Sequence, residues 1–370
     1  MALFLTSLTF TGAGEWLRRH GVDGPVLLID NASRNLDDRD AIVGPAQAEL
    51  AAEGIASQRV DVLRHDPAAV ERAGAIVMTG GDPFVLLADL RASGADATIA
   101  AARNRGVPIV GQSAGAIVCG PTLEPIRLTS PFTAPDGLDL RGLTLTDTLV
   151  LPHHDRPGRA ELHRRAALRF GSDPTLFPLW DDETLVIEHD TWQIRRGAQR
   201  TRRALSSDAP GVADVFGAAA RAAWGSFLPD DVLTQAGKDL DGWKDRVRLG
   251  GHRFLVVEDD DGLIGFVWYH HAASAAEDAP VGEIDVLYTH PRAWGAGTGR
   301  RLLDRATWNL LCEGYREAVL WTEERNERAL GVYSRSGWVP DGAIDERKFL
   351  GAPIRNARHR LDLTRYAGGE

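Results

Sequence analysis

The sequence predicts an α/β protein of two domains, with a doubly wound, mainly parallel sheet in the N-terminal half and an α+β domain in the C-terminal half. Three observations predict this fold class. Short apolar runs alternate with helical segments in the first half, which is typical of a parallel sheet covered by helices. A polar stretch rich in small residues then interrupts the pattern. Seven of the ten tryptophans follow that stretch, which indicates a separately built second domain.

The elements of the first half follow from apolar runs and from helical spacing. Short apolar runs predict buried strands, and Ala- and Leu-rich segments with spaced apolar residues predict helices. In chain order, strands are expected at residues 2–8, 25–29, 74–78, 108–110, 145–151 and 184–188, and helices at residues 40–53 and 84–105.

The second half mixes helices with antiparallel strands. Two apolar runs flank an acidic turn at residues 259–262, which predicts a β-hairpin. The expected elements are helices at residues 212–224 and 229–236, hairpin strands at 253–258 and 263–268, a strand at 282–289, a helix at 300–314, a strand at 318–323 and a helix at 327–336.

The domain boundary is expected in the polar stretch at residues 195–214, which contains Pro210 and Gly211. Residues 1–200 are assigned to the first domain, residues 201–212 to a linker, and residues 213–370 to the second domain.

Composition limits the classes of function. The hydrophobic content of 44% supports a sizeable core and excludes wholesale disorder. The net charge of −10 argues against a general binder of nucleic acids or anionic membranes, because nothing global attracts phosphates. Cys119 and Cys312 lie far apart, so neither a disulfide scaffold nor a thiolate zinc site follows. No basic leader and no apolar run near the ~18 residues of a membrane span are present, so a reducing cytoplasm is expected.

A serine lies on a predicted strand-to-helix turn at residues 111–115, which match the pattern GxSxG. The glycines permit a tight turn that raises the Ser113 hydroxyl above the sheet, near a helix N-terminus. The amide of Ala114 is then an expected oxyanion donor, and Gly81 in the segment TGGDP is expected to supply a second. A GxSxG match alone is as often a simple glycine turn, but the strand context and a downstream histidine favour a nucleophile.

A serine nucleophile needs a base and a group that orients the base. The segment PHHD, residues 152–155, follows a predicted strand and supplies candidate imidazoles at His153 and His154. The acidic candidates for the third role are Glu124, Asp136 and Asp155.

These segments resemble the dipeptidase E (aspartyl dipeptidase) family, relatives of cyanophycinase within the class I glutamine-amidotransferase-like fold. The resemblance covers about residues 1–197 and is carried by LTS near the start, TGGDPFVLL, GQSAGAIVCGPTL and LPHHD. It implies that Ser113 is the nucleophile and His153, directly after a proline, the base. Members of this family hydrolyse small peptides with an N-terminal Asp, or the Asp-based polymer cyanophycin. Asp82 stands where the family often has Asn.

The family's acid lies further past the serine than Glu124 does. Aligning Glu124 with it requires a deletion, and on that alignment Glu124 is the expected acid, with Asp136 as the alternative. Arg159 or Arg164 would hold a substrate carboxylate, although such arginines are more often exposed helix charges.

A second site is predicted at PRAWGAGTGRRLL, residues 291–303, between a strand and a helix. Glycines at alternate positions expose successive amides and the helix N-terminus adds its dipole, so the loop suits a pyrophosphate. A Rossmann dinucleotide site is the competing interpretation. It is disfavoured because the loop comes late in a domain that begins with helices and an antiparallel hairpin.

This loop and the segment NERALGVYSRSGW, residues 326–338, resemble the GNAT superfamily of acetyl-CoA-dependent N-acetyltransferases, whose pattern runs N-x-x-A-x-x-x-Y-x-x-x-G-aromatic. The resemblance covers about residues 210–363 and implies an α+β GNAT domain with acetyl-CoA as co-substrate. Trp294 and Ala296 depart from the family, which often has Gln or Arg at the first position and Arg at the second. Because the loop binds mostly through its backbone, binding is expected to survive both changes.

The GNAT resemblance also implies roles for single residues. Tyr333 would lie near the thioester sulfur as general acid, and Asn326 would contact the cofactor arm. Glu283 stands where histone-acetylating members carry a glutamate base, although an ordinary strand-edge carboxylate is an equal interpretation. The backbone of Leu287 and Thr289 would contact pantetheine, and the pyrophosphate would be held by Gly295, Ala296, Gly297, Thr298, Gly299 and Arg300.

No metal site is expected. His252, His270, His271 and His290 do not form a spaced ligand set, and the acidic run at residues 259–261 lacks the spacing of an EF-hand.

The leading functional hypothesis is a bifunctional enzyme, a serine hydrolase of small Asp-type peptides or aminoacyl amides joined to an N-acetyltransferase. One compound, such as an aminoacyl antibiotic or a toxic peptide-nucleotide, could be cut by one domain and acetylated by the other. An acetyltransferase whose N-terminal domain only binds substrate is the second hypothesis, and a non-enzymatic sensor of acyl-CoA is the third. Nucleic acid and membrane are not expected as partners, and a homodimer is left open.

Overall fold

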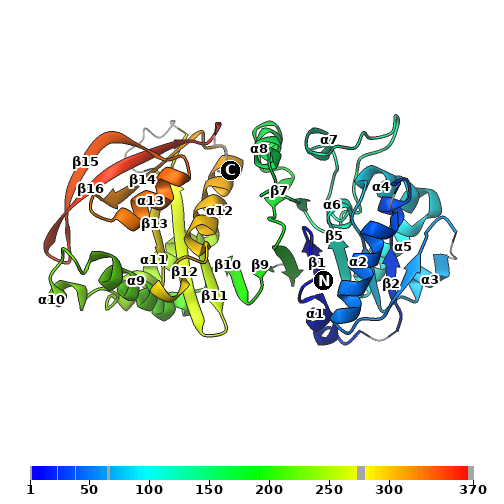
Figure 1. Cartoon of the computed structure of the whole chain (residues 1–370), viewed down its shortest axis with the longest axis horizontal. Helices are drawn as coiled ribbons and strands as arrows, with labels where there is room; N and C mark the ends of the chain where they lie inside the picture. Colours follow the sequence, from blue (N-terminus) through cyan, green and yellow to red (C-terminus); the bar gives the residue numbers. More distant parts are fainter. Residues whose placement is uncertain are drawn as a thin grey trace. The chain divides into compact units, whose positions relative to one another are not determined.

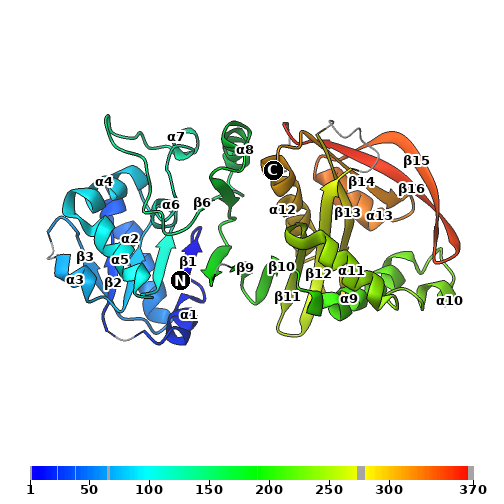
Figure 2. The same cartoon turned by 180° about the vertical axis from the view of Figure 1, so that it is seen from behind.

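The structure is a computed structural model that describes residues 2–22, 24–37, 39–64, 67–189, 191–272 and 280–365. The chain divides into two compact units, Met1–Gly197 and Ala198–Glu370. Figure 1 labels their elements, and Figure 2 shows the same elements from behind. Each unit has its own set of strands and its own apolar core.

The first unit alternates strands and helices. Its elements are β1 Ala2–Thr6, α1 Ala13–Arg19, β2 Val26–Ile29, η1 Asn31–Ser33, α2 Arg39–Ala52, β3 Ser57–Val60, α3 Pro67–Glu71, β4 Ala75–Met78, α4 Pro83–Ser93, α5 Ala95–Asn104, β5 Ile109–Gln112, α6 Ala114–Val118, α7 Ile126–Thr129, β6 Thr148–Leu151, α8 Arg159–Phe170, β7 Thr175–Pro178, β8 Thr184–Glu188 and β9 Thr191–Arg196.

The main sheet of the first unit has the strand order β9-β8-β1-β5-β4-β2-β3. Neighbouring strands in the series β1-β5-β4-β2-β3 pair in parallel. β8 pairs antiparallel with β1, and β9 pairs antiparallel with β8. Trp16 of α1 and Leu50 of α2 pack into the core on one face, and α5 lies on the other (Figures 1 and 2). β6 and β7 form a separate parallel pair. The predicted doubly wound, mainly parallel sheet is confirmed.

The second unit is an α+β domain. Its elements are β10 Gln199–Arg203, η2 Ser206–Asp208, α9 Ala209–Trp224, α10 Asp230–Leu233, α11 Leu240–Gly250, η3 Gly251–Arg253, β11 Phe254–Asp259, β12 Gly262–His271, β13 Val281–Thr289, η4 Pro291–Ala293, α12 Thr298–Cys312, β14 Glu317–Glu323, α13 Glu327–Arg335, β15 Val339–Phe349 and β16 Ala352–Asp362.

The sheet of the second unit has the order β15-β16-β14-β13-β12-β11-β10, and β13 and β14 are its parallel pair. α9 and α11 cover one face, where Val215 and Trp243 pack against Phe254 and Phe266 of β11 and β12. α12 covers the other face, as Figures 1 and 2 show from opposite sides.

The segment expected as a linker, residues 201–212, is not a separate connection. Residues 201–203 belong to β10, which pairs with β11, and α9 begins at Ala209. Pro210 lies in the first turn of α9, where its missing N–H has no helical partner to lose. The polar residues of this segment form ion pairs: Arg202 pairs with Asp208 and with Glu258, each at 2.7 Å.

Other expectations about elements also need correction. The helix expected at residues 84–105 is two helices, because Gly94 adopts φ 75° and ends α4 before α5 begins. Several elements were not expected at all, among them the helices α8 and α11 and the strands β15 and β16. Across the part of the chain that the structure describes, no helix has the length and apolar character that crossing a membrane requires.

Candidate active sites

Ser113 lies on the sharp turn between β5 and α6. Its backbone has φ 48° and ψ −106°, a conformation that residues with a side chain rarely adopt and that the surrounding structure must enforce. The turn lies close to β4, because a Cβ at Gly115 would be 2.2 Å from the carbonyl oxygen of Met78. Only glycine fits after Ala114, which explains the second glycine of the GxSxG pattern.

The hydroxyl of Ser113 contacts a histidine, which in turn contacts a carboxylate. Ser113 Oγ lies 3.0 Å from His153 Nε2, and His153 Nδ1 lies 2.5 Å from Asp181 Oδ1. His153 follows β6 and Asp181 follows β7, and these strands pair in parallel with Leu151 beside Pro178. Because parallel strands end at the same edge, the two side chains meet although they are 28 residues apart. The three groups have the geometry of a nucleophile, a base and an orienting acid.

Asp181 takes the place of the acids expected from the sequence. Glu124 and Asp136 are exposed, and in the described parts of the chain no hydrogen bond joins either carboxylate to His153. Asp155 instead accepts the backbone N–H of Asp181 at 2.9 Å. Asp181 was not among the predicted acids, because the candidates all lay close to Ser113 or His153 in the sequence. The usable signal was the apolar run of residues 175–179, which marks a further strand end directly before Asp181.

Neighbouring groups set the protonation of this site. Asp181 also accepts hydrogen bonds from Ser7 Oγ at 3.2 Å and Arg156 Nε at 2.7 Å. Burial raises the pKa of Asp181, but the hydrogen bonds from His153 and Arg156 outweigh it and hold that pKa below its usual value. Burial lowers the pKa of His153, and the bond to Asp181 offsets this only in part. Near neutral pH His153 is therefore neutral and able to accept a proton.

Two backbone amides near Ser113 are candidates to receive negative charge. A Cβ at Gly80 would lie 3.4 Å from Ser113 Cβ, so the glycine turn after β4 approaches the serine closely. Gly81 has φ 136°, and a Cβ there would lie 2.3 Å from the carbonyl oxygen of Ala32, so the turn requires glycine. No described residue accepts a hydrogen bond from the amide of Gly81 or of Ala114. Both remain candidates for the oxyanion donors, as expected from the sequence.

The structure separates the two arginine candidates. Arg164 pairs with Glu161, three residues before it on α8. Arg159 begins α8 and donates to the backbone oxygen of Thr129. Burial is the main cause of the lowered pKa of His153, and the positive charge of Arg159 lowers that pKa slightly further. Of the two, Arg159 therefore remains the candidate for contact with a substrate carboxylate.

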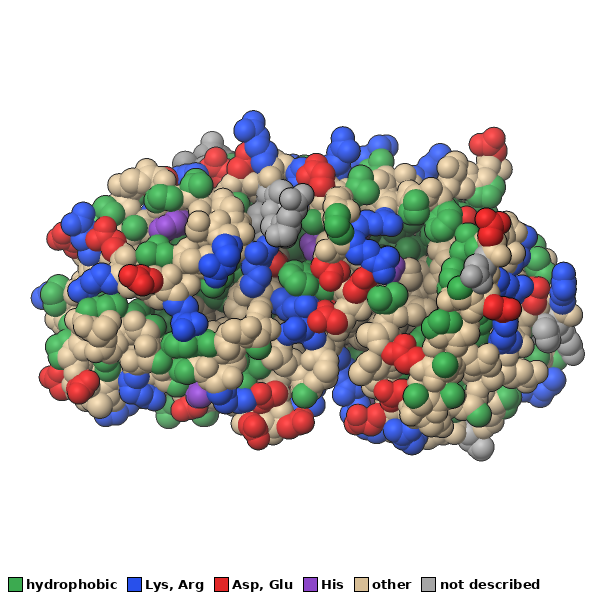
Figure 3. Space-filling model, in the orientation of Figure 1, with side chains coloured by type: hydrophobic (Ala, Val, Ile, Leu, Met, Phe, Trp, Pro, Cys, Tyr) green, Lys and Arg blue, Asp and Glu red, His purple; other side chains and the backbone are tan. Residues whose placement is uncertain are grey.

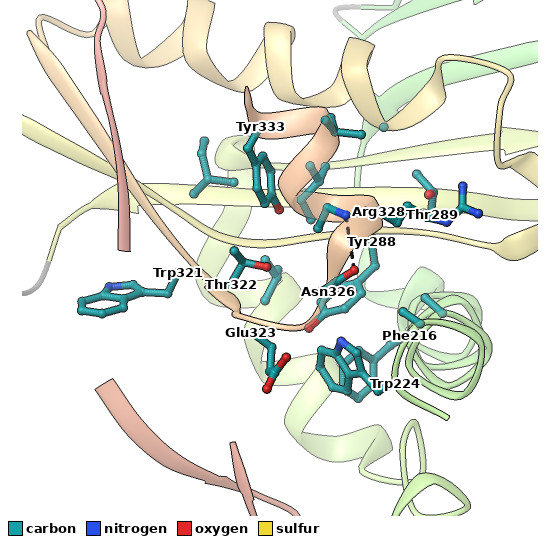
Figure 4. A pocket seen from close by; sticks show the side chains of 18 of the residues that line it. Phe216, Trp224, Tyr288, Thr289, Trp321, Thr322, Glu323, Asn326, Arg328 and Tyr333 are labelled. Atoms are coloured by element: carbon teal, nitrogen blue, oxygen red, sulfur yellow. Dashed lines mark hydrogen bonds between the residues drawn. The ribbon is translucent and has the colours of Figure 1, made fainter. Parts of the chain in front are cut away.

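The second unit contains a cavity of about 1110 Å³, part of which is drawn in Figure 4. It opens where β13 and β14 diverge. Their pairing ends at Ile284 beside Leu320, although the strands continue to Thr289 and Glu323. Residues 285–289 therefore have no pairing partner in β14. Leu287 and Thr289 line the cavity, as the expected contact with pantetheine requires.

The glycine loop opens into the same cavity. Gly295 and Gly297 adopt φ 81° and φ 79°, and α12 begins directly afterwards at Thr298. The amides of Gly295, Gly297 and Gly299 have no acceptor among the described residues, so they are available to an anion at the helix N-terminus. Of the expected loop residues, Ala296 is the one that does not line the cavity.

The cavity also holds the expected acid and base. Tyr333 is 7% exposed, and burial raises its pKa to about 12, so its hydroxyl keeps its proton at neutral pH. Asn326 Oδ1 accepts the backbone N–H of Ala329 at 3.3 Å and so caps the helix that carries Tyr333. Figure 4 shows Asn326 and Tyr333 on this one helix. Glu283 is half-buried, lines the cavity and pairs in register with Val319 of β14.

Trp294, which departs from the GNAT pattern, has a structural role at the start of the glycine loop. Its Nε1 donates to the backbone oxygen of Thr289 at 3.0 Å, which fixes the start of the glycine loop against the end of β13. The guanidinium of Arg328 lies 4.0 Å from the centroid of the Trp294 ring, a cation–π contact. Arg328, which sequence reasoning missed, thereby brings a positive charge to the cavity beside the loop.

Two family models match separate parts of the chain. Residues 20–195 match peptidase family S51, and residues 219–338 match the acetyltransferase (GNAT) family.

Similar proteins match either half. An uncharacterized peptidase of Listeria innocua is 26% identical over 129 residues, which is 35% of this chain and 62% of that protein. A mycothiol acetyltransferase of Beutenbergia cavernae is 40% identical over 88 residues, 24% of this chain and 28% of that protein. The chain thus spans less than two thirds of the length of either relative. The solved structure of a putative peptidase E protein from Listeria monocytogenes EGD-e is 22% identical, covers 53% of this chain and 98% of its own, and gives a TM-score of 0.45.

Proposed function

The chain carries a peptidase family S51 domain in its N-terminal half and a GNAT acetyltransferase domain in its C-terminal half, and from this premise we propose that it is a bifunctional enzyme. The first unit hydrolyses a small peptide or aminoacyl amide through a serine nucleophile. The second unit transfers an acetyl group from acetyl-CoA to a primary amine.

In the hydrolysis, Ser113 Oγ attacks the amide carbonyl while His153 Nε2 takes its proton. Asp181 holds the imidazole in one orientation and stabilises its charged form. The amides of Gly81 and Ala114 donate to the oxyanion that develops on the former carbonyl oxygen. His153 then gives its proton to the departing amine, and water, activated by the same imidazole, releases the acyl group from Ser113. The 3.0 Å and 2.5 Å contacts of His153 are the observation that carries this half of the proposal.

A substrate with an acidic group suits the hydrolase site. Arg156 is engaged by Asp181 at 2.7 Å, whereas the Arg159 guanidinium donates to a backbone oxygen rather than to a carboxylate. A guanidinium has five N–H donors, so Arg159 can bind a substrate carboxylate as well. This supports a peptide or aminoacyl amide with an Asp-type residue.

In the acetyl transfer, the cavity residues fit acetyl-CoA. The unpaired amides of Gly295, Gly297 and Gly299 suit its pyrophosphate, and the open edge of β13 suits its pantetheine arm. When bound, acetyl-CoA supplies the acetyl thioester. Glu283 takes a proton from the acceptor ammonium, directly or through water, so that the neutral amine can attack. Tyr333 donates its phenolic proton toward the departing sulfur.

A mass-spectrometric screen tests both halves at once. Asp-X peptides and aminoacyl amides are incubated with and without acetyl-CoA, and loss of mass by hydrolysis is separated from the gain of an acetyl group. Ser113→Ala is expected to abolish hydrolysis alone. Tyr333→Phe is expected to lower acetyl transfer by about 10²- to 10⁴-fold without affecting hydrolysis. Absence of both reactions from the wild type across the panel would contradict the proposal.

An acetyltransferase whose first unit only binds substrate is the competing function. It does not account for the strained Ser113 turn or for the imidazole and carboxylate aligned behind the hydroxyl. A serine-reactive phosphonate decides between the two. Labelling of the wild type, lost in Ser113→Ala and in His153→Ala, supports the hydrolase.

The two reactions share a substrate feature, a free amine near a cleavable amide. We extend the proposal to a detoxifying enzyme in the cytoplasm that acts on one aminoacyl antibiotic or peptide-nucleotide with both sites. Cells that express the wild type should survive such compounds better than cells that express Ser113→Ala or Tyr333→Phe. Equal survival with both variants would remove the detoxifying role and leave the two activities standing.

A further inference from the structure

The cavity of the second unit is lined from both faces of the sheet. Tyr288 and Thr289 are neighbours on β13, so their side chains face opposite sides. Thr289 faces α12, because its Cγ2 lies 3.5 Å from the Cβ position of Gly299. Tyr288 faces α9, because its ring lies 5.0 Å from the ring of Phe216. The glycine loop therefore belongs to the α12 face, and the α9 face offers a second approach to the opening between β13 and β14.

Four aromatic rings form the wall of the cavity on the α9 face. They come from three elements: Phe216 and Trp224 from α9, Tyr288 from β13 and Phe349 from β15. Neighbouring centroids are 5.0 Å apart for Phe216 and Tyr288, 6.4 Å for Tyr288 and Trp224, 4.7 Å for Trp224 and Phe349, and 5.9 Å for Phe349 and Phe216. We call these four residues the aromatic wall.

The rings of the aromatic wall are too close to enclose a ligand between them. Their interplanar angles of 63° to 86° show edge-to-face packing, which leaves ring surface turned outward. Phe216, Tyr288 and Phe349 are only partly buried, and all four rings line the cavity. Ala219 and Ala223 of α9 line it as well, so small side chains leave room in front of the rings. The wall thus offers a second substrate a mainly apolar surface of ring faces and ring edges.

The aromatic wall also contains a buried donor without a partner. Trp224 is 7% exposed, and its Nε1 has no hydrogen-bond acceptor among the described residues. In Figure 4 the indole nitrogen lies on the side of the ring nearer to Asn326 and Tyr333. A buried N–H that lacks an acceptor weakens a structure unless a water or a ligand supplies one. The donor therefore indicates an acceptor atom on the molecule that occupies this part of the cavity.

We propose that the amine acceptor of the acetyl transfer carries a flat aromatic ring that packs on the aromatic wall, and an oxygen that accepts the Trp224 N–H. This inference rests on the proposed acetyl transfer and names the substrate class of that site. An aromatic aminoacyl amide combines the three features, because its ring, its carbonyl oxygen and its amine lie within a few bonds of each other.

Matched acceptors test the inference. Phenylalanine amide is compared with cyclohexylalanine amide, which has the same length and a saturated ring, and with 2-phenylethylamine, which lacks the carbonyl. CoA release at saturating acetyl-CoA gives kcat/KM for each. The wild type is expected to prefer phenylalanine amide over cyclohexylalanine amide by about 3- to 10-fold, the range for aromatic pairs beyond area burial.

Two substitutions and one control locate the effect. Phe349→Leu should remove the preference for the aromatic ring, whereas Phe227→Leu should keep it, since Phe227 packs in the same core cluster without lining the cavity. Trp224→Phe keeps a ring and removes the donor, so it should lower kcat/KM for phenylalanine amide but not for 2-phenylethylamine. An unchanged Kd for acetyl-CoA shows that each variant is folded.

The outcomes separate this inference from the function on which it rests. Acetylation of all three amines at equal kcat/KM would overturn the inference and leave the acetyltransferase standing. If no amine is acetylated, the acetyl transfer itself fails, and calorimetric binding of the same amines to the CoA complex then decides the inference. Equal affinity for the aromatic and saturated amides, or no binding of either, would overturn it.

Discussion

The imidazole of His153 depends on residues from three loops for its position and its charge. Ser7 accepts the His153 backbone N–H at 2.8 Å and donates to Asp181 at 3.2 Å, so one hydroxyl ties the base to the acid. Arg156 occupies the second oxygen of Asp181. With both oxygens engaged, the carboxylate cannot rotate away from His153 Nδ1, and the imidazole keeps Nε2 directed at Ser113.

Replacement of the orienting acid is the sharpest test at the residue scale. Asp181→Asn should lower kcat for amide hydrolysis by about 10³- to 10⁴-fold, because the neutral amide can hold the wrong tautomer of the imidazole. The matched variant Glu124→Gln should retain wild-type activity, since Glu124 is exposed and forms no hydrogen bond to His153 in the described parts of the chain. If Glu124→Gln lowered kcat strongly and Asp181→Asn hardly changed it, Glu124 and not Asp181 would be the orienting acid.

The lowered pKa of His153 predicts the pH profile of hydrolysis. Burial disfavours the imidazolium, so the base stays neutral to a pH below the ordinary histidine value of 6.5. The acid limb of kcat/KM is therefore expected below pH 6.5, with a plateau around pH 7. A limb centred above pH 6.5 in steady-state measurements would contradict this environment for His153.

At the scale of elements, both sites use the same construction, a strand followed by a glycine turn and a helix N-terminus. β5 leads into α6 at Ser113, and β13 leads through the glycine loop into α12. Such turns expose amides that the helix does not use. The two turns differ in how tightly they are packed. Gly115 touches β4, whereas Gly295 and Gly297 face open space, which leaves room for a ligand as large as a pyrophosphate.

This difference predicts the effect of a methyl group in the second loop. Gly297→Ala should cost about 1–2 kcal/mol of stability, because φ is 79° and no atom lies within 4 Å of the new Cβ. It should also weaken acetyl-CoA binding by disturbing the amides of the loop. Gly314→Ala is the control, since Gly314 has φ 97° and equally open surroundings after the end of α12 but does not line the cavity. Calorimetry should find similar destabilisation and a raised Kd only for Gly297→Ala.

At the scale of the whole molecule, the two proposed reactions belong to two units with separate cores. The residues of the Ser113 site all lie in Met1–Gly197, and those of the cavity proposed for acetyl-CoA all lie in Ala198–Glu370. Neither proposed reaction needs a side chain from the other unit, so the activities should be separable by single substitutions.

Acid should destabilise the two units unequally. His163 is 1% exposed, and burial, with a smaller effect of His154, holds its pKa well below 6.5. As pH falls below 6.5 the unfolded chain binds a proton that the folded unit excludes, which removes up to about 1.4 kcal/mol per pH unit for this group. His153, also lowered, acts in the same direction. Between pH 7 and pH 5, the hydrogen-exchange protection factors, which are corrected for the intrinsic exchange rate at each pH, should therefore fall more in the core peptides of the first unit.

A pair of histidine variants checks the origin of this effect. His163→Leu should flatten the acid dependence of the first unit, whereas His252→Leu, at an exposed site in the second unit, should leave it unchanged. If His163→Leu kept the full acid dependence, the buried imidazole would not be its cause.

Features encoded over a few adjacent residues could be predicted from the sequence. Ser113, Ala114 and the glycines of both loops were found because turn geometry depends on neighbours in the chain. Helix α11 was not predicted because its charged residues and glycines outnumber its apolar residues. Two of those apolar residues, Trp243 and Val247, are buried against α9 and β11. The stretch at residues 201–212 was mistaken for a linker because its arginines and aspartates look solvated until their ion pairs are seen.

The sequence by itself determined the fold class, the two family resemblances, the nucleophile and base candidates, and the anion loop, since each depends on local patterns. Only the tertiary structure brings together Asp181 with His153 and the four rings of the aromatic wall, on which the proposed acid and the proposed acceptor site depend. Asp181 meets His153 only because β6 and β7 pair in parallel and end together. The aromatic wall exists only because α9, β13 and β15 bring rings from distant positions to one face of the sheet. Contacts of this kind depend on strand order and helix packing, which no short run of residues specifies.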